Sequence, residues 1–315
     1  LPGVGDGSFL APLAVPTGNT PETAVVADMD KDGDADVVSA NWSMDVFVLF
    51  NDGSAGLTPP PPSTGTEGNR PVSVAVADFD GDTIEDAAVA HRNSNDVAIL
   101  PGNDDGTFDP PVPIEVGETP TNISLGHFNA DAFVDLVVPS QSGNSISLLL
   151  GKGDGTFEAP ATIDLTIGNL PSYGTVGRFN GDAFDDVAVA VETAQKVAIL
   201  LGNGDGTFQT PQVIDTNRSP QFITSADINA DTFQDLLVGV NDFPGGVAVH
   251  MGSGDGTFGA PTLILALGSS LYIQSIEVAD MDQDTFQDVI AVAGYSDPVD
   301  SKGVGQFVGG FFLLY

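Results

Sequence analysis

An aspartate-rich motif recurs six times along the chain and is the strongest constraint on its fold. The first copy reads Asp28-Met-Asp-Lys-Asp-Gly-Asp-Ala-Asp36, with aspartates at positions 1, 3, 5 and 9. Later copies begin at Asp78, His127, Arg178, Asp227 and Asp280, at steps of 50, 49, 51, 49 and 53 residues. A nearly constant period of this length is typical of repeat architectures, in which each repeat forms one supersecondary unit.

A glycine-rich motif alternates with the aspartate motif. Its clearest copy is Gly202-Asn-Gly-Asp-Gly-Thr-Phe208, and other copies begin at Gly3, Gly102, Gly151 and Gly252. Asn-Gly and Asp-Gly steps supply the positive φ angles that tight hairpin turns require. The segments between the turns are short and rich in Val and Ile, which predicts strands such as 72–78, 86–90, 97–100 and 111–116. No stretch shows a sustained helical period.

Four short strands in each repeat of about 50 residues predict an all-β protein, a β-propeller of four-stranded antiparallel blades. Residues 3–15 match the turn and fourth strand of a repeat, and residues 306–315 match a third strand. We therefore expect the N-terminal strand to complete the last blade, which leaves no open sheet edge. The prediction is one domain, 1–315, with six blades at about 22–67, 71–117, 120–168, 171–217, 220–266, and 271–315 joined with 1–18.

The spacing of the aspartates predicts metal sites. Carboxylates at positions 1, 3, 5 and 9 of a tight loop can converge on one point, and such a density of hard oxygen ligands suits Ca²⁺. Mg²⁺ fits less well because it demands stricter octahedral geometry. The complete ligand sets are Asp28, Asp30, Asp32 and Asp36; Asp78, Asp80, Asp82 and Asp86; and Asp280, Asp282, Asp284 and Asp288. The alternative is that these are ordinary polar hairpin loops, but carboxylates so close together repel one another without a cation.

The other three copies depart from the full set. One replaces a carboxylate by an amide oxygen and is expected to bind Ca²⁺ through Asp227, Asn229, Asp231 and Asp235. Another begins with His127 and offers Asn129, Asp131 and Asp135, so Ca²⁺ binding there is left open. In the copy that begins with Arg178, the guanidinium is expected to take the place of the metal and to pair with Asp182 or Asp186. Four or five Ca²⁺ sites are predicted in all.

These motifs resemble the FG-GAP/VCBS repeats. The resemblance rests on Ala77-Asp-Phe-Asp-Gly-Asp82 followed by Asp86, and on the Gly-Asn-Gly-Asp-Gly-Thr-Phe turns, and it covers essentially the whole chain. Repeats of this kind build the calcium-bearing propeller of integrin α subunits and occur in fungal lectins and bacterial surface proteins. The resemblance implies a calcium-bearing propeller. The sequence departs from the family at position 6, where glycine occurs only as Gly33, and in having six blades where seven are common.

The composition excludes several classes of function. The chain carries 44 acidic and 8 basic residues, a formal net charge of −36, which disfavours binding to nucleic acid or to anionic membranes. It has no cysteine, so neither disulfides nor thiolate zinc sites can form. Its apolar runs are far shorter than the roughly 20 residues that span a bilayer, so no membrane insertion is expected. Strong acidity together with Ca²⁺ loops favours a secreted or cell-surface protein.

Binding residues are expected on loops away from the Ca²⁺ hairpins, because no catalytic motif is present. The connections between strands 2 and 3, and between strand 4 and the next strand 1, hold the only tryptophan, three of the four tyrosines and four of the eight cationic side chains. The candidate ligand-binding residues are Trp42, His91, Arg92, Tyr173, Arg218, Tyr272 and Tyr295. Aromatic platforms beside hydrogen-bonding groups suit a glycan or a protein ligand. The same residues could instead simply cover the mouth of the propeller channel.

The sequence therefore favours a calcium-stabilised extracellular binding or adhesion module that is lectin-like. Two alternatives stay open. The chain could self-assemble as the structural subunit of an extracellular fibre or surface layer, because flat propeller faces permit stacking. It could also be a carbohydrate-active enzyme, because catalytic residues on propellers come from scattered loops.

Overall fold

The computed structural model describes residue 15 and residues 20–53, 56–58, 64–242, 245–267, 272–281, 285–296 and 307–314. These residues form two compact units, which meet in sequence between Asp164 and Leu165. No helix among the described residues is long and apolar enough to cross a membrane.

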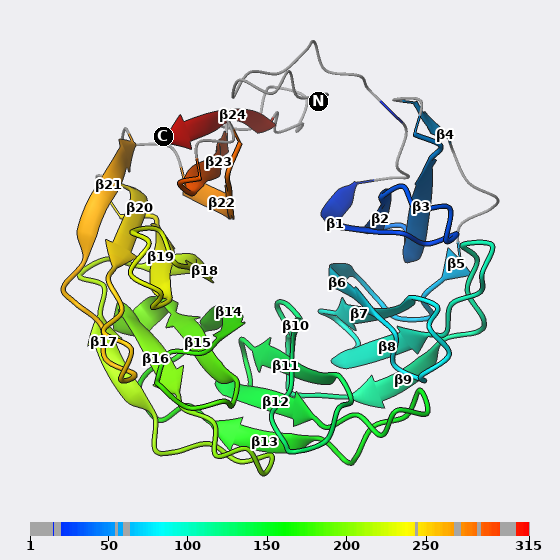
Figure 1. Cartoon of the computed structure of the whole chain (residues 1–315), viewed down its shortest axis with the longest axis horizontal. Coiled ribbons are helices and arrows are strands. Elements are labelled where there is room, and N and C mark those ends of the chain that lie inside the picture. The colour runs from blue at the N-terminus through cyan, green and yellow to red at the C-terminus, as the bar shows by residue number, and fades with distance from the viewer. Residues whose placement is uncertain are drawn as a thin grey trace. The chain divides into compact units, whose positions relative to one another are not determined.

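The first unit contains three antiparallel sheets whose strands follow the chain order (Figure 1). Their strands are β1 (Pro21–Ala27), β2 (Asp36–Asn41), β3 (Asp45–Asn51), β4 (Leu57–Thr58) and β5 (Thr64–Gly65); β6 (Pro71–Ala77), β7 (Asp86–His91), β8 (Asp96–Leu100) and β9 (Val112–Glu115); and β10 (Ser124–Gly126), β11 (Asp135–Ser140), β12 (Ser145–Leu149) and β13 (Ala161–Asp164). In the first sheet, both β4 and β5 pair with β3.

The second unit contains the remaining three antiparallel sheets. Their strands are β14 (Pro171–Gly177), β15 (Asp186–Val191), β16 (Lys196–Leu200) and β17 (Gln212–Asp215); β18 (Pro220–Ala226), β19 (Asp235–Val240), β20 (Gly245–His250) and β21 (Thr262–Leu267); and β22 (Tyr272–Ala279), β23 (Asp288–Ser296) and β24 (Phe307–Leu314). One short 3₁₀ helix, η1 (Glu192–Ala194), links β15 to β16.

These repeated four-stranded sheets are the blades of a β-propeller, which confirms the predicted fold class. The predicted blade count is wrong for the described residues, which form five sheets of four or more strands where six complete blades were predicted. The sixth repeat forms the three-stranded sheet of β22, β23 and β24. Its predicted fourth strand falls on residues 1–18, which lie outside the described residues apart from residue 15.

The hydrophobic cores lie between successive sheets within each unit. Strand β7 is buried on both faces: Ala88 and Ala90 pack with the β10–β13 sheet, and Ala87 and Val89 pack with the β1–β4 sheet. Strands buried on both faces read as continuous apolar runs, so the alternation expected of a half-exposed strand is absent. The β18–β21 sheet is packed on both faces in the same way.

The glycine-rich turns take the predicted conformation. Gly204 and Gly206 have φ angles of 72° and 78°, and the equivalent glycines of the neighbouring repeats also have positive φ. The Asp205 carboxylate accepts the Thr207 hydroxyl at 2.5 Å and the Thr207 N–H at 3.1 Å, which closes the turn. Within each unit, a phenylalanine that ends such a turn packs edge-to-face on the preceding blade: Phe157 on Phe79 at 5.7 Å and Phe258 on Phe179 at 5.5 Å. These turns therefore also fasten one blade to the next.

Candidate metal centre and ligand face

The aspartate motifs form the loops between the first and second strands of each sheet. Each loop is named here by its first residue: the Asp28 loop (28–36), Asp78 loop (78–86), His127 loop (127–135), Arg178 loop (178–186), Asp227 loop (227–235) and Asp280 loop (280–288).

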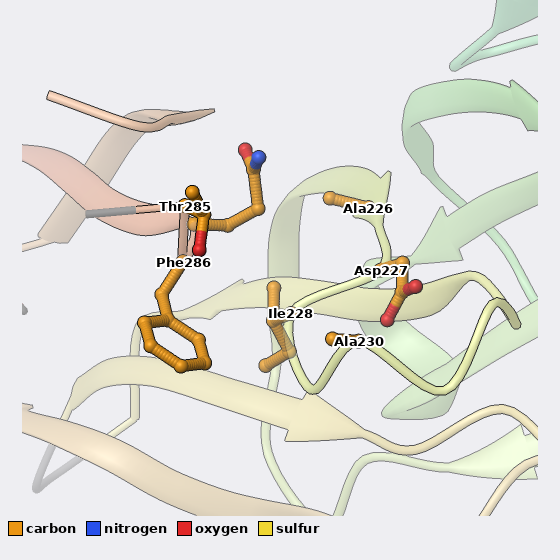
Figure 2. Close-up of a pocket in the computed structure, with 7 residues that line it drawn as sticks. Ala226, Asp227, Ile228, Ala230, Thr285 and Phe286 are labelled. Carbon is orange, nitrogen blue, oxygen red and sulfur yellow. The ribbon is translucent and has the colours of Figure 1, made fainter. Parts of the chain in front are cut away.

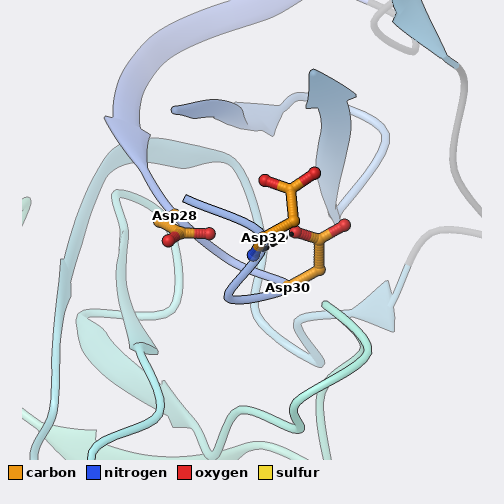
Figure 3. Close-up of side chains that lie close together, drawn as sticks. All are labelled: Asp28, Asp30 and Asp32. Atoms are coloured by element: carbon orange, nitrogen blue, oxygen red, sulfur yellow. Dashed lines mark hydrogen bonds between the residues drawn. The ribbon is translucent and has the colours of Figure 1, made fainter. Parts of the chain in front are cut away.

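The Asp28 loop brings three carboxylates together. One oxygen from each of Asp28, Asp30 and Asp32 lies within 4.8 Å of the others (Figure 3). The Oδ1 atom of Asp28 is buried and has no hydrogen-bond partner. The pKa of Asp30 is raised, first by desolvation and then by the charges of Asp32, Asp36 and Asp28. A buried, unpartnered carboxylate oxygen beside two further carboxylates is a donor set that fits a hard cation.

The Asp78 loop forms a second cluster of the same kind. Oxygens of Asp78, Asp80 and Asp86 lie within 4.8 Å of one another, whereas Asp82 is not part of the group. Within the described part of the chain, no further trio of acidic or histidine ligand atoms is gathered as closely.

The six aspartate loops fall into two groups by their backbone conformation at position 6. At position 6, Gly33, Thr83, Thr232 and Thr285 have φ angles between 73° and 93°, and each donates its N–H to the carboxylate of the position-1 aspartate. At the equivalent position, Ala132 and Ala183 do not have positive φ. A β-branched residue at positive φ is strained, and such strain gathers at functional sites. At position 6, the loops that begin with aspartate thus share a positive φ angle, which is strained at the three threonines but not at Gly33, and which the His127 and Arg178 loops lack.

The aspartates at position 9 of the loops accept hydrogen bonds from backbone N–H groups. Asp186 is fully buried, and its two oxygens accept the Phe179 and Gly202 N–H groups, each at 2.8 Å. The same pair of bonds is made by Asp36, Asp86, Asp135 and Asp235, which join the aspartate loop to the end of the third strand. For Asp288 the described bond is the one from the Met281 N–H, at 2.8 Å. These residues therefore have a structural role whether or not they also contact a cation.

Burial raises the pKa of most position-9 aspartates. The pKa of Asp86 rises to about 6, because burial outweighs the two backbone N–H groups that lower it, and the charges of Asp80 and Asp82 raise it further. The pKa values of Asp135, Asp186 and Asp235 are raised for the same leading reason. A cation bound to the loop would oppose this shift by favouring the ionised form.

The His127 and Arg178 loops are closed by other means. The Nδ1 atom of His127 lies 2.8 Å from the Phe133 carbonyl oxygen. The Arg178 Nε donates to Asp185 at 3.1 Å, so the predicted pairing with Asp182 or Asp186 is wrong. The reason is that both oxygens of Asp186 already accept backbone N–H groups, and Asp182 accepts the Phe184 N–H at 2.9 Å.

In the remaining predicted loops, only some of the candidate ligand side chains contact one another. In the Asp227 loop, Asp227 accepts the Asp231 and Thr232 N–H groups, and Asn229 hydrogen-bonds Asp231 at 2.9 Å. In the Asp280 loop, Asp282 and Asp284 lie outside the described residues. In the His127 loop, the Asn129 Nδ2 donates to Asp131 at 2.8 Å, which orients its amide nitrogen towards the neighbouring carboxylate.

A pocket of about 350 Å³ lies beside the Asp227 loop within the second unit (Figure 2). It is lined by Ala226, Asp227, Ile228, Ala230, Thr285, Phe286 and Gln287. Phe286 is 62% exposed and is the position-7 residue of its loop. Phe133, Phe184 and Phe233 are exposed at the same position of their loops. These aromatic residues were not among the predicted binding residues, although their identical position in four repeats is visible in the sequence.

The predicted ligand-face residues differ widely in exposure. Trp42 is 45% exposed, and Arg70 lies over its ring at 4.6 Å. His91 is fully buried, with its Nδ1 2.6 Å from Asp96. Tyr173 is partly buried and packs on Phe222 with ring centroids 4.3 Å apart, and desolvation raises its pKa to about 12. The fully buried His91 supports the fold and cannot contact a ligand without rearrangement.

Three further candidates have different settings. Arg92 is half-buried and donates to the Gln141 side chain at 2.5 Å. Arg218 lies between β17 and β18, where its carbonyl oxygen accepts the Thr216 hydroxyl at 2.5 Å. Tyr272 begins β22 and Tyr295 lies near the end of β23, but their side chains lie outside the described part of the structure.

Known proteins share both the repeat and the fold of this chain. A model of the FG-GAP-like repeat matches residues 28–89, 127–189, 178–238 and 227–291. No curated protein matches the chain. A lectin from Agrocybe aegerita that specifically recognises non-reducing terminal N-acetylglucosamine is 19% identical, with a TM-score of 0.61 over 93% of this chain and 80% of the lectin chain.

Two bacterial structures are similar to the same degree. A protein from Lactobacillus plantarum is 16% identical, with a TM-score of 0.64 over 94% of this chain and 85% of its own. A putative 6-phosphogluconolactonase from Bacteroides fragilis is 13% identical, with a TM-score of 0.61 over 93% of this chain and 84% of its own. Identities this low establish a shared fold only.

Proposed function

The chain belongs to the FG-GAP-like repeat family, and we propose on that premise that it is a calcium-stabilised β-propeller that binds glycans outside the cell. The observation that carries the calcium part is the Asp28 cluster, where an unpartnered buried carboxylate oxygen lies beside two other carboxylates. Asp28, Asp30 and Asp32 would hold one Ca²⁺, and Asp78, Asp80 and Asp86 a second. The bound cation would neutralise the carboxylates and offset the strain at position 6.

Calcium at these loops would add to stability and would not perform chemistry. Extracellular modules bind Ca²⁺ with dissociation constants of roughly 10⁻⁴–10⁻³ M. A site at 100 times its dissociation constant contributes about 2.7 kcal/mol to the free energy of unfolding. Such sites are matched to a secreted or cell-surface protein, because free Ca²⁺ reaches these concentrations outside the cell.

Thermal unfolding in calcium and in chelator tests this part of the proposal. We expect calcium to raise the Tm of the wild type, and Asp28→Asn with Asp78→Asn to remove most of that rise. Each substitution is nearly isosteric and removes one negative charge from its cluster, while the amide oxygen can still accept the position-6 N–H. Asp182→Asn, in the Arg178 loop, is the matched control and should leave the calcium response unchanged. Equal Tm values in calcium and chelator would refute a structural role for calcium.

Glycan binding is proposed for the face that carries Trp42. An indole ring with almost half of its surface exposed, beside the guanidinium of Arg70, is a platform on which a sugar ring can stack. A glycan is the ligand class to test first, because a lectin that recognises N-acetylglucosamine shares this fold. Trp42 lies in the turn between β2 and β3, which is the other end of the strands from the Asp28 loop.

A glycan array in calcium tests the ligand class, with N-acetylglucosamine among its probes. We expect reproducible binding that is lost in Trp42→Ala. Met44→Ala is the matched control, because Met44 is 49% exposed in the same turn. Folded, calcium-loaded protein that binds no glycan would reject this part of the proposal and would favour a protein ligand or self-assembly.

A further inference from the structure

Two arginines lie next to each other although the chain has 44 acidic residues available to separate them. The Arg92 N–H donates to the Arg70 carbonyl oxygen at 2.9 Å, which places the β7–β8 turn beside the connection from β5 to β6. Lys152, Arg178 and Lys196 each form an ion pair with a carboxylate. Among the described residues, neither Arg70 nor Arg92 has such a partner. Their charges are therefore placed for something other than internal pairing.

The two guanidinium groups are held in place and are partly removed from water. Burial lowers the pKa of Arg92, and the charge of Arg70 lowers it further, whereas the nearby charge of Glu22 opposes the shift. Gln141 fixes the Arg92 guanidinium by accepting its hydrogen bond. Arg70 is fixed over Trp42, whose Nε1 in turn donates to Glu22 at 2.9 Å. Two preorganised cations beside an exposed aromatic ring can recognise an anionic group that is attached to an apolar ring face.

Unpartnered polar atoms surround the same connection. The Nε atom of Arg70 and the Oγ1 atom of Thr66 are buried without a hydrogen-bond partner. Between them, a Cβ atom on Gly68 would lie 2.2 Å from the His91 ring, so the backbone of 66–70 packs directly on that imidazole. The Nε2 atom of this fully buried His91 is also unpartnered. Buried polar atoms without partners cost free energy, and a polar ligand can supply the missing bonds.

The repeats show that the fold does not require these arginines. Arg70 has a φ angle of 63°, and the equivalent residues Thr20, Thr119 and Leu170 have φ angles of 54°, 60° and 64°. The first residue after the second strand is Arg92 in the second repeat, but Gln141 in the third. Other side chains therefore satisfy the same backbone conformation, and the presence of arginine calls for a different reason.

We propose that Arg70, Arg92 and Trp42 form a subsite for an anionic sugar, a uronate or a sulfated residue whose acidic group pairs with the guanidinium groups while its ring stacks on the indole. The inference rests on the proposed glycan binding and names the chemical class of the ligand. The net charge of −36 does not exclude it, because at physiological ionic strength charges interact over a Debye length of only about 8 Å.

Binding of matched acidic and neutral oligosaccharides tests the inference. One pair is a galacturonate disaccharide and its methyl ester, and the other is a sulfated glucan oligosaccharide and its unsulfated form. The two pairs distinguish carboxylate from sulfate as the recognised group. All titrations use protein saturated with calcium, and the ligands are kept short so that calcium does not crosslink them.

The variants are chosen from residues that other repeats already carry. Arg70→Thr reproduces Thr20 and Thr119, and Arg92→Gln reproduces Gln141, so both should fold. Lys196→Gln is the control, because it removes one positive charge from an ion pair elsewhere. We expect the wild type to bind one acidic ligand at least about tenfold more tightly than its neutral form. Each arginine variant should lose most of that preference, and Lys196→Gln should keep it.

Three outcomes would overturn the inference. The first is equal affinity for acidic and neutral forms, and in that case glycan binding itself stands if both forms bind and both depend on Trp42. The second is an acidic preference that survives in Arg70→Thr and Arg92→Gln, which places the anion elsewhere, for example on calcium in the aspartate loops. The third is no binding of any saccharide to folded protein, which rejects the proposed glycan function as well.

Discussion

Removing the Asp186 carboxylate isolates the structural role of the position-9 aspartates from any effect of metal, because the Arg178 loop is the one that is not expected to bind calcium. Asp186→Ala leaves the Phe179 and Gly202 N–H groups without acceptors, and both bonds are buried at 2.8 Å. Each unsatisfied buried donor costs about 1–3 kcal/mol, so the free energy of unfolding should fall by about 2–6 kcal/mol. Asp186→Asn keeps an acceptor for only one N–H and should cost roughly half as much.

Chemical denaturation followed by circular dichroism measures this loss. Asp182→Ala is the control, because Asp182 is exposed in the same loop and water can replace its bond to the Phe184 N–H; its cost should stay below about 1 kcal/mol. The loss in Asp186→Ala should be the same in calcium and in chelator. A loss below about 1 kcal/mol, or one that appears only in calcium, would refute the argument that this carboxylate acts by pairing buried backbone donors.

Two further predictions concern the calcium-free protein. Burial raises the pKa of Asp86 from 3.8 to about 6, so between these pH values the folded state binds a proton that the unfolded chain has released. The protonated carboxyl group therefore contributes to the free energy of unfolding below about pH 4, and this contribution is lost as the pH rises through 6. The Tm of calcium-depleted protein should therefore be lower at pH 7 than at pH 5, and added calcium should reduce the difference; a Tm that rises over this range contradicts the prediction. Thr83→Gly should raise the free energy of unfolding by about 1 kcal/mol, because Thr83 has a φ angle of 73° that glycine adopts without strain. Ala183→Gly, at a position without positive φ, should lower it. Equal effects of the two substitutions in chemical denaturation would show that position 6 is not strained.

The repeat period predicted most of the fold. Strands, turns and the four-stranded sheets follow from alternating Val-rich segments and Asp-Gly turns, which are local signals. The number of complete blades was not predictable in the same way, because it depends on whether segments at opposite ends of the chain pair. No local pattern specifies such a long-range pairing.

The spacing of the aspartates located the candidate metal loops but not the role of each carboxylate. The Arg178 loop keeps Asp182 and Asp186 although no cation is expected there. Their presence was the sequence signal that the aspartates at positions 5 and 9 accept backbone hydrogen bonds. The ligand face was harder to predict, because residue type does not indicate burial. His91 is the last residue of β7 and is fully buried, whereas Trp42 is the first residue after β2 and is 45% exposed.

Equilibrium dialysis of radioactive calcium against calcium-depleted protein tests the central claim most directly. We predict saturable binding at no fewer than two sites per chain, at dissociation constants of roughly 10⁻⁴–10⁻³ M, with Asp28→Asn and Asp78→Asn each removing one site and Asp182→Asn removing none. Binding that does not exceed the buffer level at millimolar calcium, or that is unchanged in the Asp28→Asn and Asp78→Asn variants, would contradict this prediction.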